Sequence, residues 1–317
     1  MEIGIVTDSF AHLPFERMLD TAAGLGLTAV ELPTGGWSSA PHLDLAAVLG
    51  DAGERDRCLG AIRERGLRVS ALNINGNQLH PVIGGRIDEL VHRTVDLAEL
   101  MGVGTVVLMS GLPAGAPGDR TPNWVTTSWP PETQEVLDYQ WNEVAIPYWR
   151  LLARYGEERG VRFAVEMHGD QLVYNTATLL RLREAVGANL DPSHPMWMGA
   201  DPRAMAAALA GAVYNVHAKD ARVNEAISAV NGLLDTQPPE RAATRAWNYV
   251  TLGLGRPGGR QFWGQLLADL RAGGYDGVLA IEHEDVLFDA VEGVEATVSL
   301  LREVTPVLPP SWKPQDV

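Results

Sequence analysis

The chain alternates short apolar segments with longer amphipathic ones, and this alternation recurs eight times with few breaks in composition. A short apolar run rich in β-branched residues is typical of a buried strand, whereas apolar residues recurring every three to four positions indicate a helix. Helical patterns fill the stretches between the strands, for example 14–26, 85–102 and 259–274. The predicted strands cover residues 2–7, 29–33, 68–74, 105–111, 162–167, 188–194, 213–220 and 277–284.

Eight strands that are each followed by a helix predict an α/β fold of the (β/α)8 barrel type. A doubly wound open sheet is the alternative, but it typically has a glycine-rich fingerprint after its first strand, and TDSFAHLPF has none. We expect one barrel over residues 1–305 and a proline-rich C-terminal tail over 306–317. The long connections 112–132 and 221–258 follow the fourth and seventh strands, so we expect lids or binding walls on the catalytic face.

Composition limits the partners of this 317-residue chain. Its 25 basic and 40 acidic side chains give a net charge of −15, which disfavours nucleic acid or an anionic membrane as a partner. Its apolar runs are too short to cross a bilayer, and the residues after Met1 resemble a strand rather than a signal peptide, so a cytoplasmic location is expected. Because Cys58 is the only cysteine, an internal disulfide and a thiolate metal cluster are excluded.

Each of the last four predicted strands carries an ionisable residue near its carboxyl end: Glu166, Asp191, His217 and Glu282. Any one of them alone would be an ordinary rim residue, but all four occupy the same relative position, where barrels of this type carry their active sites. Three neighbouring carboxylates repel one another unless a cation lies between them. Oxygen and imidazole donors suit one divalent metal, and Mn²⁺ is the favoured ion, with Mg²⁺, Co²⁺ and Zn²⁺ as alternatives.

Two further residues share inward faces with these ligands because side chains alternate along a strand. His168 follows Glu166 by two positions and is a candidate for moving a proton or for binding a substrate hydroxyl. Lys219 follows His217 by two positions and would either neutralise a substrate oxyanion or form an ion pair with a nearby carboxylate, the candidates being Glu282, Glu284 and Asp220.

Three residues outside these strand ends are candidates for binding substrate. Asn73 and His80, after the third strand, could bind sugar hydroxyls, although turn formation is an equally good explanation for such residues. Trp124, in the first long connection, could stack on a ring, hold the connection against the barrel or line a subunit interface.

Over essentially its full length the chain resembles the xylose isomerase-like barrel superfamily, the sugar phosphate isomerase/epimerase group. The segments that carry the resemblance are AVEMH, LDPSH, NVHAKD, LGLGRPGG and GYDGVLAIEHED. The resemblance implies that Glu166, Asp191, His217 and Glu282 hold the metal, and that the two glutamates exchange the substrate proton. It also implies that His194 contacts substrate. The glycine-rich loop lies where such barrels often bind phosphate, but bringing backbone close to the site is its favoured role.

The chain also departs from the ketose epimerases of this family. Leu172 stands where they carry a further acidic residue, and His168 and the two long connections are more like members that act on inositols or oxidised glycosides, such as the larger subunit of C-glycoside deglycosylating enzymes. We therefore expect a metal-dependent sugar isomerase or epimerase that works through an enediolate. The alternative is a lyase or dehydratase that eliminates a β leaving group from a 3-oxo-glycoside or an inosose.

Two other functions are less favoured. A metal-dependent endonuclease of the same fold would need more histidine ligands and a basic groove, which the net charge disfavours. A catalytically inactive sugar-binding subunit would keep the fold without the chemistry. The expected partner is a small-molecule sugar or glycoside, and the remaining alternatives are a homo-oligomer and a small partner subunit.

Overall fold

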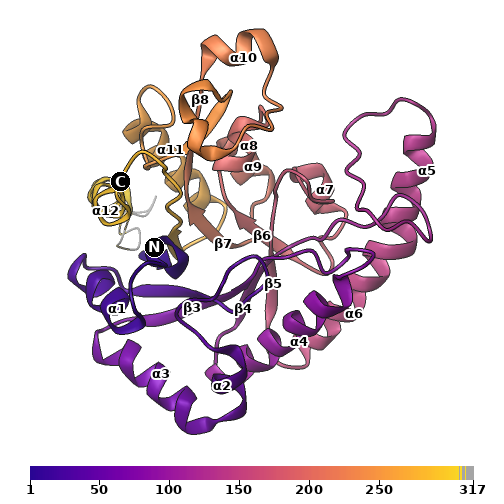
Figure 1. Ribbon diagram of the computed structural model, residues 1–317. Coiled ribbons are helices and arrows are strands. Elements are labelled where there is room, and N and C mark those ends of the chain that lie inside the picture. The colour runs from indigo at the N-terminus through magenta and orange to yellow at the C-terminus, as the bar shows by residue number, and fades with distance from the viewer. Residues whose placement is uncertain (307, 309–310, 312–317) are drawn as a thin grey trace.

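The computed structural model describes residues 1–306, 308 and 311, and it confirms the predicted (β/α)8 barrel. Eight parallel strands close in the order β1-β10-β7-β6-β5-β4-β3-β2, and helices surround them (Figure 1). The barrel strands are β1 (Glu2–Val6), β2 (Ala29–Pro33), β3 (Arg68–Ile74), β4 (Thr105–Met109), β5 (Arg162–Glu166), β6 (Gly187–Leu190), β7 (Val213–Ala218) and β10 (Val278–Ile281).

Several strands end earlier than the sequence predicts, because the chain turns away from the sheet where its polar residues begin. β6 stops at Leu190 rather than at residue 194, and the Asp191 carboxylate accepts a hydrogen bond from the Ser193 backbone N–H at the start of the next helix. β10 stops at Ile281, so Glu282 lies immediately beyond it. The predicted site residues of these strands therefore lie at the barrel mouth rather than within the ladder.

Amphipathic helices cover the outside of the barrel and bury their apolar faces against the strands. Trp149 and Trp263 are among the largest fully buried side chains and come from two of these helices. The helices are α1 (Phe15–Gly24), α2 (Leu45–Gly50), α3 (Ala52–Glu64), α4 (Gly84–Met101), α5 (Glu132–Asp138), α6 (Ile146–Glu157), α7 (Thr176–Leu180), α8 (Ser193–Trp197), α9 (Pro202–Ala208), α11 (Gly259–Ala272) and α12 (Ala290–Val304).

Small apolar residues fill the lower part of the barrel interior. Two buried clusters separate from the main core contain mostly alanine and valine, among them Ala29, Ala71, Ala164 and Ala280. Two residues further along three of these strands stand Glu31, Glu166 and Glu282, on the same face by the period of two. Barrel interiors usually carry bulky branched side chains throughout, whereas here small ones lie beneath a polar layer.

Both long connections contain ordered elements. The first has an isolated bridge between Ala114 and Pro122, and it leads into α5 and then a π-helix (Tyr139–Ala145). The buried Gln140 amide donates hydrogen bonds to the carbonyl oxygens of Pro113, Ala114 and Asn123, which holds this connection against the barrel.

The second connection begins with β8 (Asp220–Val223), which pairs antiparallel with β9 (Trp247–Val250). Between these strands lie α10 (Glu225–Asn231) and a 3-10 helix (Pro239–Thr244). In Figure 1 the β8 and α10 segment, in orange, stands above the strands at the top of the view. The connection therefore forms a wall at the barrel mouth.

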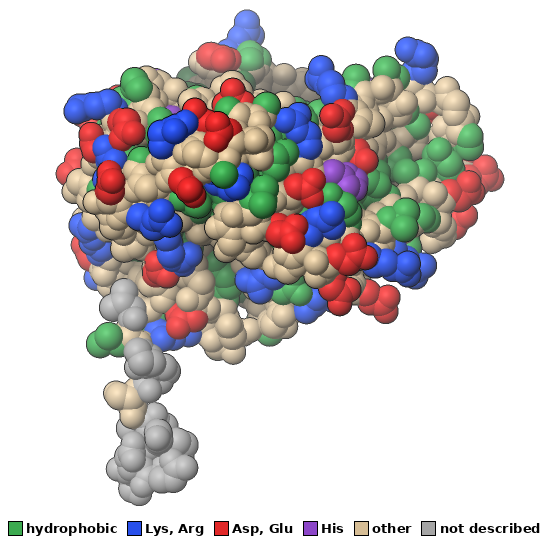
Figure 2. Space-filling view, turned by 90° about the horizontal axis from the view of Figure 1, so that it is seen from below, with side chains coloured by type: hydrophobic (Ala, Val, Ile, Leu, Met, Phe, Trp, Pro, Cys, Tyr) green, Lys and Arg blue, Asp and Glu red, His purple; other side chains and the backbone are tan. Residues whose placement is uncertain are grey.

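Acidic and basic side chains are interspersed on the face shown in Figure 2. Within the described part of the chain, we find no helix with the length and apolarity that a membrane span requires. Most of the predicted tail 306–317 lies outside the described residues.

Candidate active site

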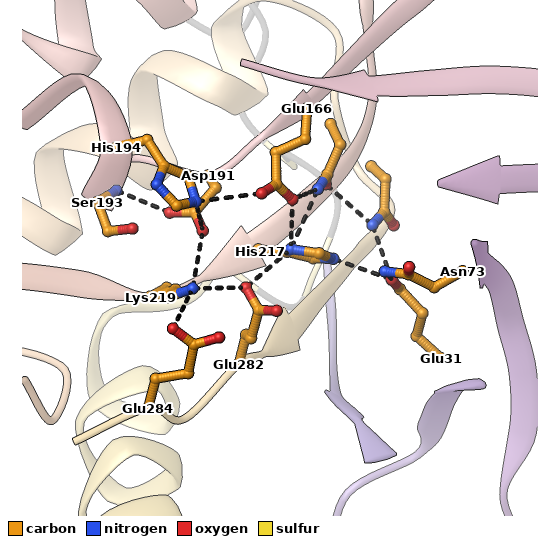
Figure 3. A network of polar contacts seen from close by, with 12 residues as sticks. Glu31, Asn73, Glu166, Asp191, Ser193, His194, His217, Lys219, Glu282 and Glu284 are labelled. Carbon is orange, nitrogen blue, oxygen red and sulfur yellow. Dashed lines mark hydrogen bonds and ion pairs between the residues drawn. The ribbon is translucent and has the colours of Figure 1, made fainter. Parts of the chain in front are cut away.

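The four residues expected to hold a metal converge at the barrel mouth. Glu166, Asp191, His217 and Glu282 each offer a ligand atom, and these atoms all lie within 4.8 Å of one another. The His217 Nδ1 atom lies 3.0 Å from Glu166 Oε2 and 3.2 Å from Glu282 Oε2. Figure 3 shows His217 between the two glutamates, each from a different strand end.

The donor set fits a divalent cation. Asp191 uses one carboxylate oxygen to accept the Ser193 N–H at 2.7 Å. Its other oxygen, Oδ2, is buried and accepts no hydrogen bond from the described residues; the His194 Nε2 atom lies 3.2 Å away and the Lys219 Nζ atom 3.9 Å away. A buried carboxylate oxygen without a hydrogen bond is costly, and a coordinated cation would remove that cost.

Glu31, on β2, is a site residue that sequence reasoning missed. Its carboxylate is fully buried, and its Oε1 atom lies 2.9 Å from His217 Nε2. Since His217 turns Nδ1 toward the other ligands, Nε2–H is the nitrogen that donates to Glu31. A carboxylate on the second nitrogen is the usual support of a metal-binding histidine, because it fixes the tautomer and increases the basicity of the ligand.

Three buried asparagines complete this polar layer. Asn73 donates to Glu31 Oε1 at 2.8 Å, and Asn215 donates to Glu31 Oε2 at 2.9 Å. Asn189 donates to Glu166 Oε2 at 2.7 Å and accepts from Asn215 through its own side-chain oxygen at 3.1 Å. The network joins five strands, so it fixes the orientation of the glutamates before any ligand binds.

Charges in the site are mutually compensated. Burial opposes ionisation of Glu166, but the neighbouring His194 and His217 rings outweigh it and lower the pKa of that carboxyl well below its usual range. Burial likewise opposes ionisation of Glu282, but Lys219 and His217 lower its pKa to about 2. Burial disfavours the charged form of His194, yet the Asp191 and Glu166 carboxylates raise its pKa to about 9. Both glutamates are therefore ionised at neutral pH.

His194 and His168 stand side by side on the wall next to Glu166. Their ring centroids are 4.1 Å apart, and the His194 Nε2 atom lies 3.1 Å from Glu166 Oε1. The hydroxyl of Tyr249, on β9, lies 2.9 Å from His194 Nδ1, so the second long connection supports this wall. His168 Nδ1 donates to the Gly169 carbonyl at 2.5 Å, which leaves Nε2 as the nitrogen with a lone pair. Burial and the charge of His194 lower the pKa of His168 to about 4.

Lys219 forms the ion pairs that were expected as one of its two roles. Its Nζ atom lies 3.2 Å from Glu282 Oε2 and 2.8 Å from Glu284 Oε2 (Figure 3). Asp220, also considered as its partner, instead accepts hydrogen bonds from the backbone N–H of Gly253 at 2.8 Å and from Trp263 Nε1 at 3.1 Å.

A cavity of about 290 Å³ opens above these groups. Six of the predicted residues line it: Asn73, Glu166, His168, His194, Lys219 and Glu282. Sequence reasoning missed three others that line it, Asp8, Trp37 and Tyr249, and it named Glu284, which also lines it, only as a possible partner of Lys219. Asp8 lies two positions beyond the end of β1, and a carboxylate just after a barrel strand was the signal available in the sequence.

Two predicted substrate-binding residues are not brought to this cavity. The His80 Nδ1 atom accepts backbone N–H groups of Val82 and Ile83, which makes it a turn residue. Trp124 lines a separate groove of about 400 Å³ together with Trp197 and Leu233. This groove adjoins the site, because a Cβ atom at Gly169 would lie 2.8 Å from Trp197 and 3.7 Å from Trp124.

A closed (β/α)8 barrel with carboxylates and histidines gathered at the carboxyl ends of its strands has the architecture of a barrel enzyme. The chain belongs to the xylose isomerase-like TIM barrel family, whose profile matches residues 19–304. It is 45% identical over 311 residues to the uncharacterised protein YfiH of Bacillus subtilis (strain 168), covering 96% of this chain and 99% of that protein.

Solved structures resemble the fold at low sequence identity. A probable 3-DHS dehydratase, AsbF, from Bacillus anthracis superposes with a TM-score of 0.65 at 16% identity, covering 95% of this chain and 99% of that one. The IOLI protein with a binding zinc atom superposes with a TM-score of 0.63 at 16% identity, covering 96% and 98%. An L-ribulose 3-epimerase superposes with a TM-score of 0.61 at 16% identity, covering 95% and 93%. These likenesses establish the shared fold.

Proposed function

We propose that this protein is a divalent-metal-dependent sugar isomerase or epimerase that removes a proton from the carbon next to a carbonyl. The observation that carries the proposal is the convergence of Glu166, Asp191, His217 and Glu282 within 4.8 Å beneath a cavity. When bound, Mn²⁺ or a similar ion would polarise the substrate carbonyl and stabilise the negative charge of an enediolate. The neighbouring epimerase and the zinc-containing structure support this assignment.

Glu282 and Glu166 are the two candidates for moving the proton. The Glu282 side chain is 15% exposed and that of Glu166 is 2% exposed, so Glu282 presents more of its carboxylate to the cavity. Asn189 and His217 both contact Glu166 Oε2, which leaves its Oε1 on the side of His194. In the proposed reaction one glutamate takes the proton, and the other returns it at a different position or from the other face.

His168 and Lys219 bind and orient the substrate in this proposal. With its Nδ1–H donated to Gly169, His168 offers the Nε2 lone pair to a substrate hydroxyl. The low pKa of His168 keeps its ring neutral, so Nε2 can accept a hydrogen bond from a substrate hydroxyl. Lys219 is held beside Glu282 and keeps that carboxylate ionised, ready to accept a proton.

Proton NMR in D₂O tests the proposal with a panel of ketoses, inososes and 3-oxo-glycosides. We expect the Mn²⁺-loaded protein to exchange a substrate C–H for deuterium and the chelated protein to lose this exchange. Asp191→Asn, which removes a ligand without removing either glutamate, should also lose it. The exposed variant Asp56→Asn on α3 is the matched control. Exchange that persists at full rate in Asp191→Asn would refute the proposal.

A lyase is the second candidate, because the Trp124 groove offers space beside His168 for a leaving group. The neighbouring structure of a probable 3-DHS dehydratase supports this candidate. The two functions share proton removal and differ in the next chemical step, which is reprotonation for the isomerase and loss of a leaving group for the lyase. Release of aglycone from a 3-oxo-glycoside in the same NMR experiment would favour the lyase, whereas exchange in a ketose without release would favour the isomerase.

A further inference from the structure

The walls of the active-site cavity are acidic beyond what metal binding requires. Besides Glu166 and Glu282, the cavity is lined by the carboxylates of Asp8 and Glu284. Among the described residues that line it, Lys219 is the one with a permanent positive charge, and both Glu282 and Glu284 already pair with it. Apart from a bound metal, an anionic substituent on a substrate would therefore meet carboxylates and two positively charged side chains, Lys219 and His194, that already pair with carboxylates.

The place where barrels of this kind often bind phosphate is taken by the protein itself. The Asp220 Oδ2 atom accepts the backbone N–H of Gly253 at 2.8 Å and that of Gly255 at 3.4 Å, so these donors point to an internal carboxylate. Arg256 stacks on the Phe262 ring at 4.1 Å, and Arg260 pairs with Glu303 at 2.7 Å. The loop donors and arginines that could hold a phosphate are thus engaged elsewhere.

Asp8 lies across the barrel mouth from the histidine wall. It follows β1, which is separated from β5 by three strands in either direction round the closed barrel, so the residues after these two strands face each other. His168 follows β5 and lines the same cavity. The Asp8 Oδ1 atom is buried and accepts no hydrogen bond from the described residues. The Asp8 side chain as a whole is half-buried and lines the cavity, and a carboxylate in a cavity wall is suited to accept a hydrogen bond from a ligand hydroxyl.

Trp37 borders the cavity beside Asp8. Its side chain is 58% exposed, and its backbone N–H donates to the Asn75 carbonyl at 2.7 Å, which fixes the loop after β2. A large aromatic face held at the rim can cover the C–H face of a ring, while Asp8 accepts hydrogen bonds from its hydroxyls.

We propose that the substrate is an uncharged, hydroxyl-rich carbonyl compound and that Asp8 binds its hydroxyl groups, so phosphorylated sugars are excluded. The inference rests on the proposed function for the identity of the site. Asp8 accepts hydroxyl hydrogens across the cavity from His168, and the remaining carboxylates repel a phosphate.

The first test uses compounds that bind without reacting, so that its outcome does not depend on catalysis. The free alditols D-glucitol, D-mannitol and myo-inositol are compared with glucitol 6-phosphate, mannitol 1-phosphate and myo-inositol 1-phosphate, each titrated into the Mn²⁺-loaded protein by calorimetry. We expect at least one free compound to bind at least about tenfold more tightly than its phosphate ester, because the ester adds charge to an acidic cavity. Equal or tighter binding of the esters, or no binding by any free compound, would overturn the inference.

The second test assigns the role of Asp8. Asp8→Asn keeps the shape of the side chain and should weaken binding of the free alditol about tenfold. It should also reduce the difference in affinity between the alditol and its phosphate ester. Asp56→Asn removes the same charge from the exposed face of α3 and should change neither the affinity for the free alditol nor that for its phosphate ester. Unchanged affinity in Asp8→Asn, with normal metal content, would overturn the assignment. Normal alditol binding without deuterium exchange in any carbonyl compound would instead refute the proposed function and leave this inference standing.

Discussion

Replacing Glu31 with glutamine should weaken metal binding although it removes no metal ligand. Three donors converge on the two oxygens of this buried carboxylate: His217 Nε2 at 2.9 Å, Asn73 at 2.8 Å and Asn215 at 2.9 Å. A glutamine would support His217 with a neutral amide oxygen and would turn its own N–H₂ toward one of these donors. Loss of a supporting carboxylate typically lowers metal affinity roughly 10–100-fold, which corresponds to about 1.4–2.7 kcal/mol.

The same substitution should also destabilise the metal-free protein by about 1–3 kcal/mol, because it leaves a buried donor without an acceptor. Competition between the protein and a fluorescent chelator for Mn²⁺ or Zn²⁺ measures the affinity, and urea unfolding of the metal-free protein measures the stability. Glu303→Gln, on the exposed face of α12, is the matched control. A Glu31→Gln variant that folds and binds metal as tightly as the unaltered protein would refute the role of Glu31 as the support of His217.

Three other predictions concern the ligands, the buried Asp220 and the Trp37 loop. Glu282→Gln should lose most of its metal on mild chelation as measured by elemental analysis, and full retention would contradict the ligand assignment. Asp220→Ala should lower the free energy of unfolding by about 3 kcal/mol or more, since it leaves the Gly253 N–H and the Trp263 indole without an acceptor; an unchanged urea midpoint would contradict this. Gly36→Ala should raise KM without altering metal affinity, because Gly36 has a φ of +78° and a Cβ there would overlap the Asn75 carbonyl oxygen; an unchanged KM would argue against a role for this loop in binding.

The barrel and the convergence of four candidate ligands could be anticipated because both depend on local patterns. Each of the last four barrel strands is a largely apolar run with an ionisable residue at or near its carboxyl end, and the closed topology brings those ends together. Glu166, Asp191, His217 and Glu282 were found by their common position at strand ends, without knowledge of any distance.

Glu31 was missed for a physical reason. It lies in the middle of β2 in the otherwise apolar AVELP, and its partner His217 is 186 residues away in the sequence, so no local pattern joins them. A single carboxylate within an apolar strand was the available signal, since such a group must be paired when buried.

The β8 and β9 hairpin and the separation of Trp124 from the cavity were beyond sequence reasoning as well. Pairing across a long connection depends on which of several short segments meet, and this is decided by tertiary packing. The stack of Trp197 on Trp247, with centroids 4.5 Å apart, is one such contact, and it joins α8 to β9.

Deuterium incorporation next to a carbonyl, followed by proton NMR in D₂O with and without bound metal, tests the central claim most directly. The proposed chemistry predicts exchange by the Mn²⁺-loaded protein in at least one uncharged ketose, inosose or 3-oxo-glycoside. It also predicts loss of that exchange on chelation and its recovery when metal is restored. Exchange at the same rate in the chelated protein, or no exchange by the loaded protein in any of these compounds, would contradict it.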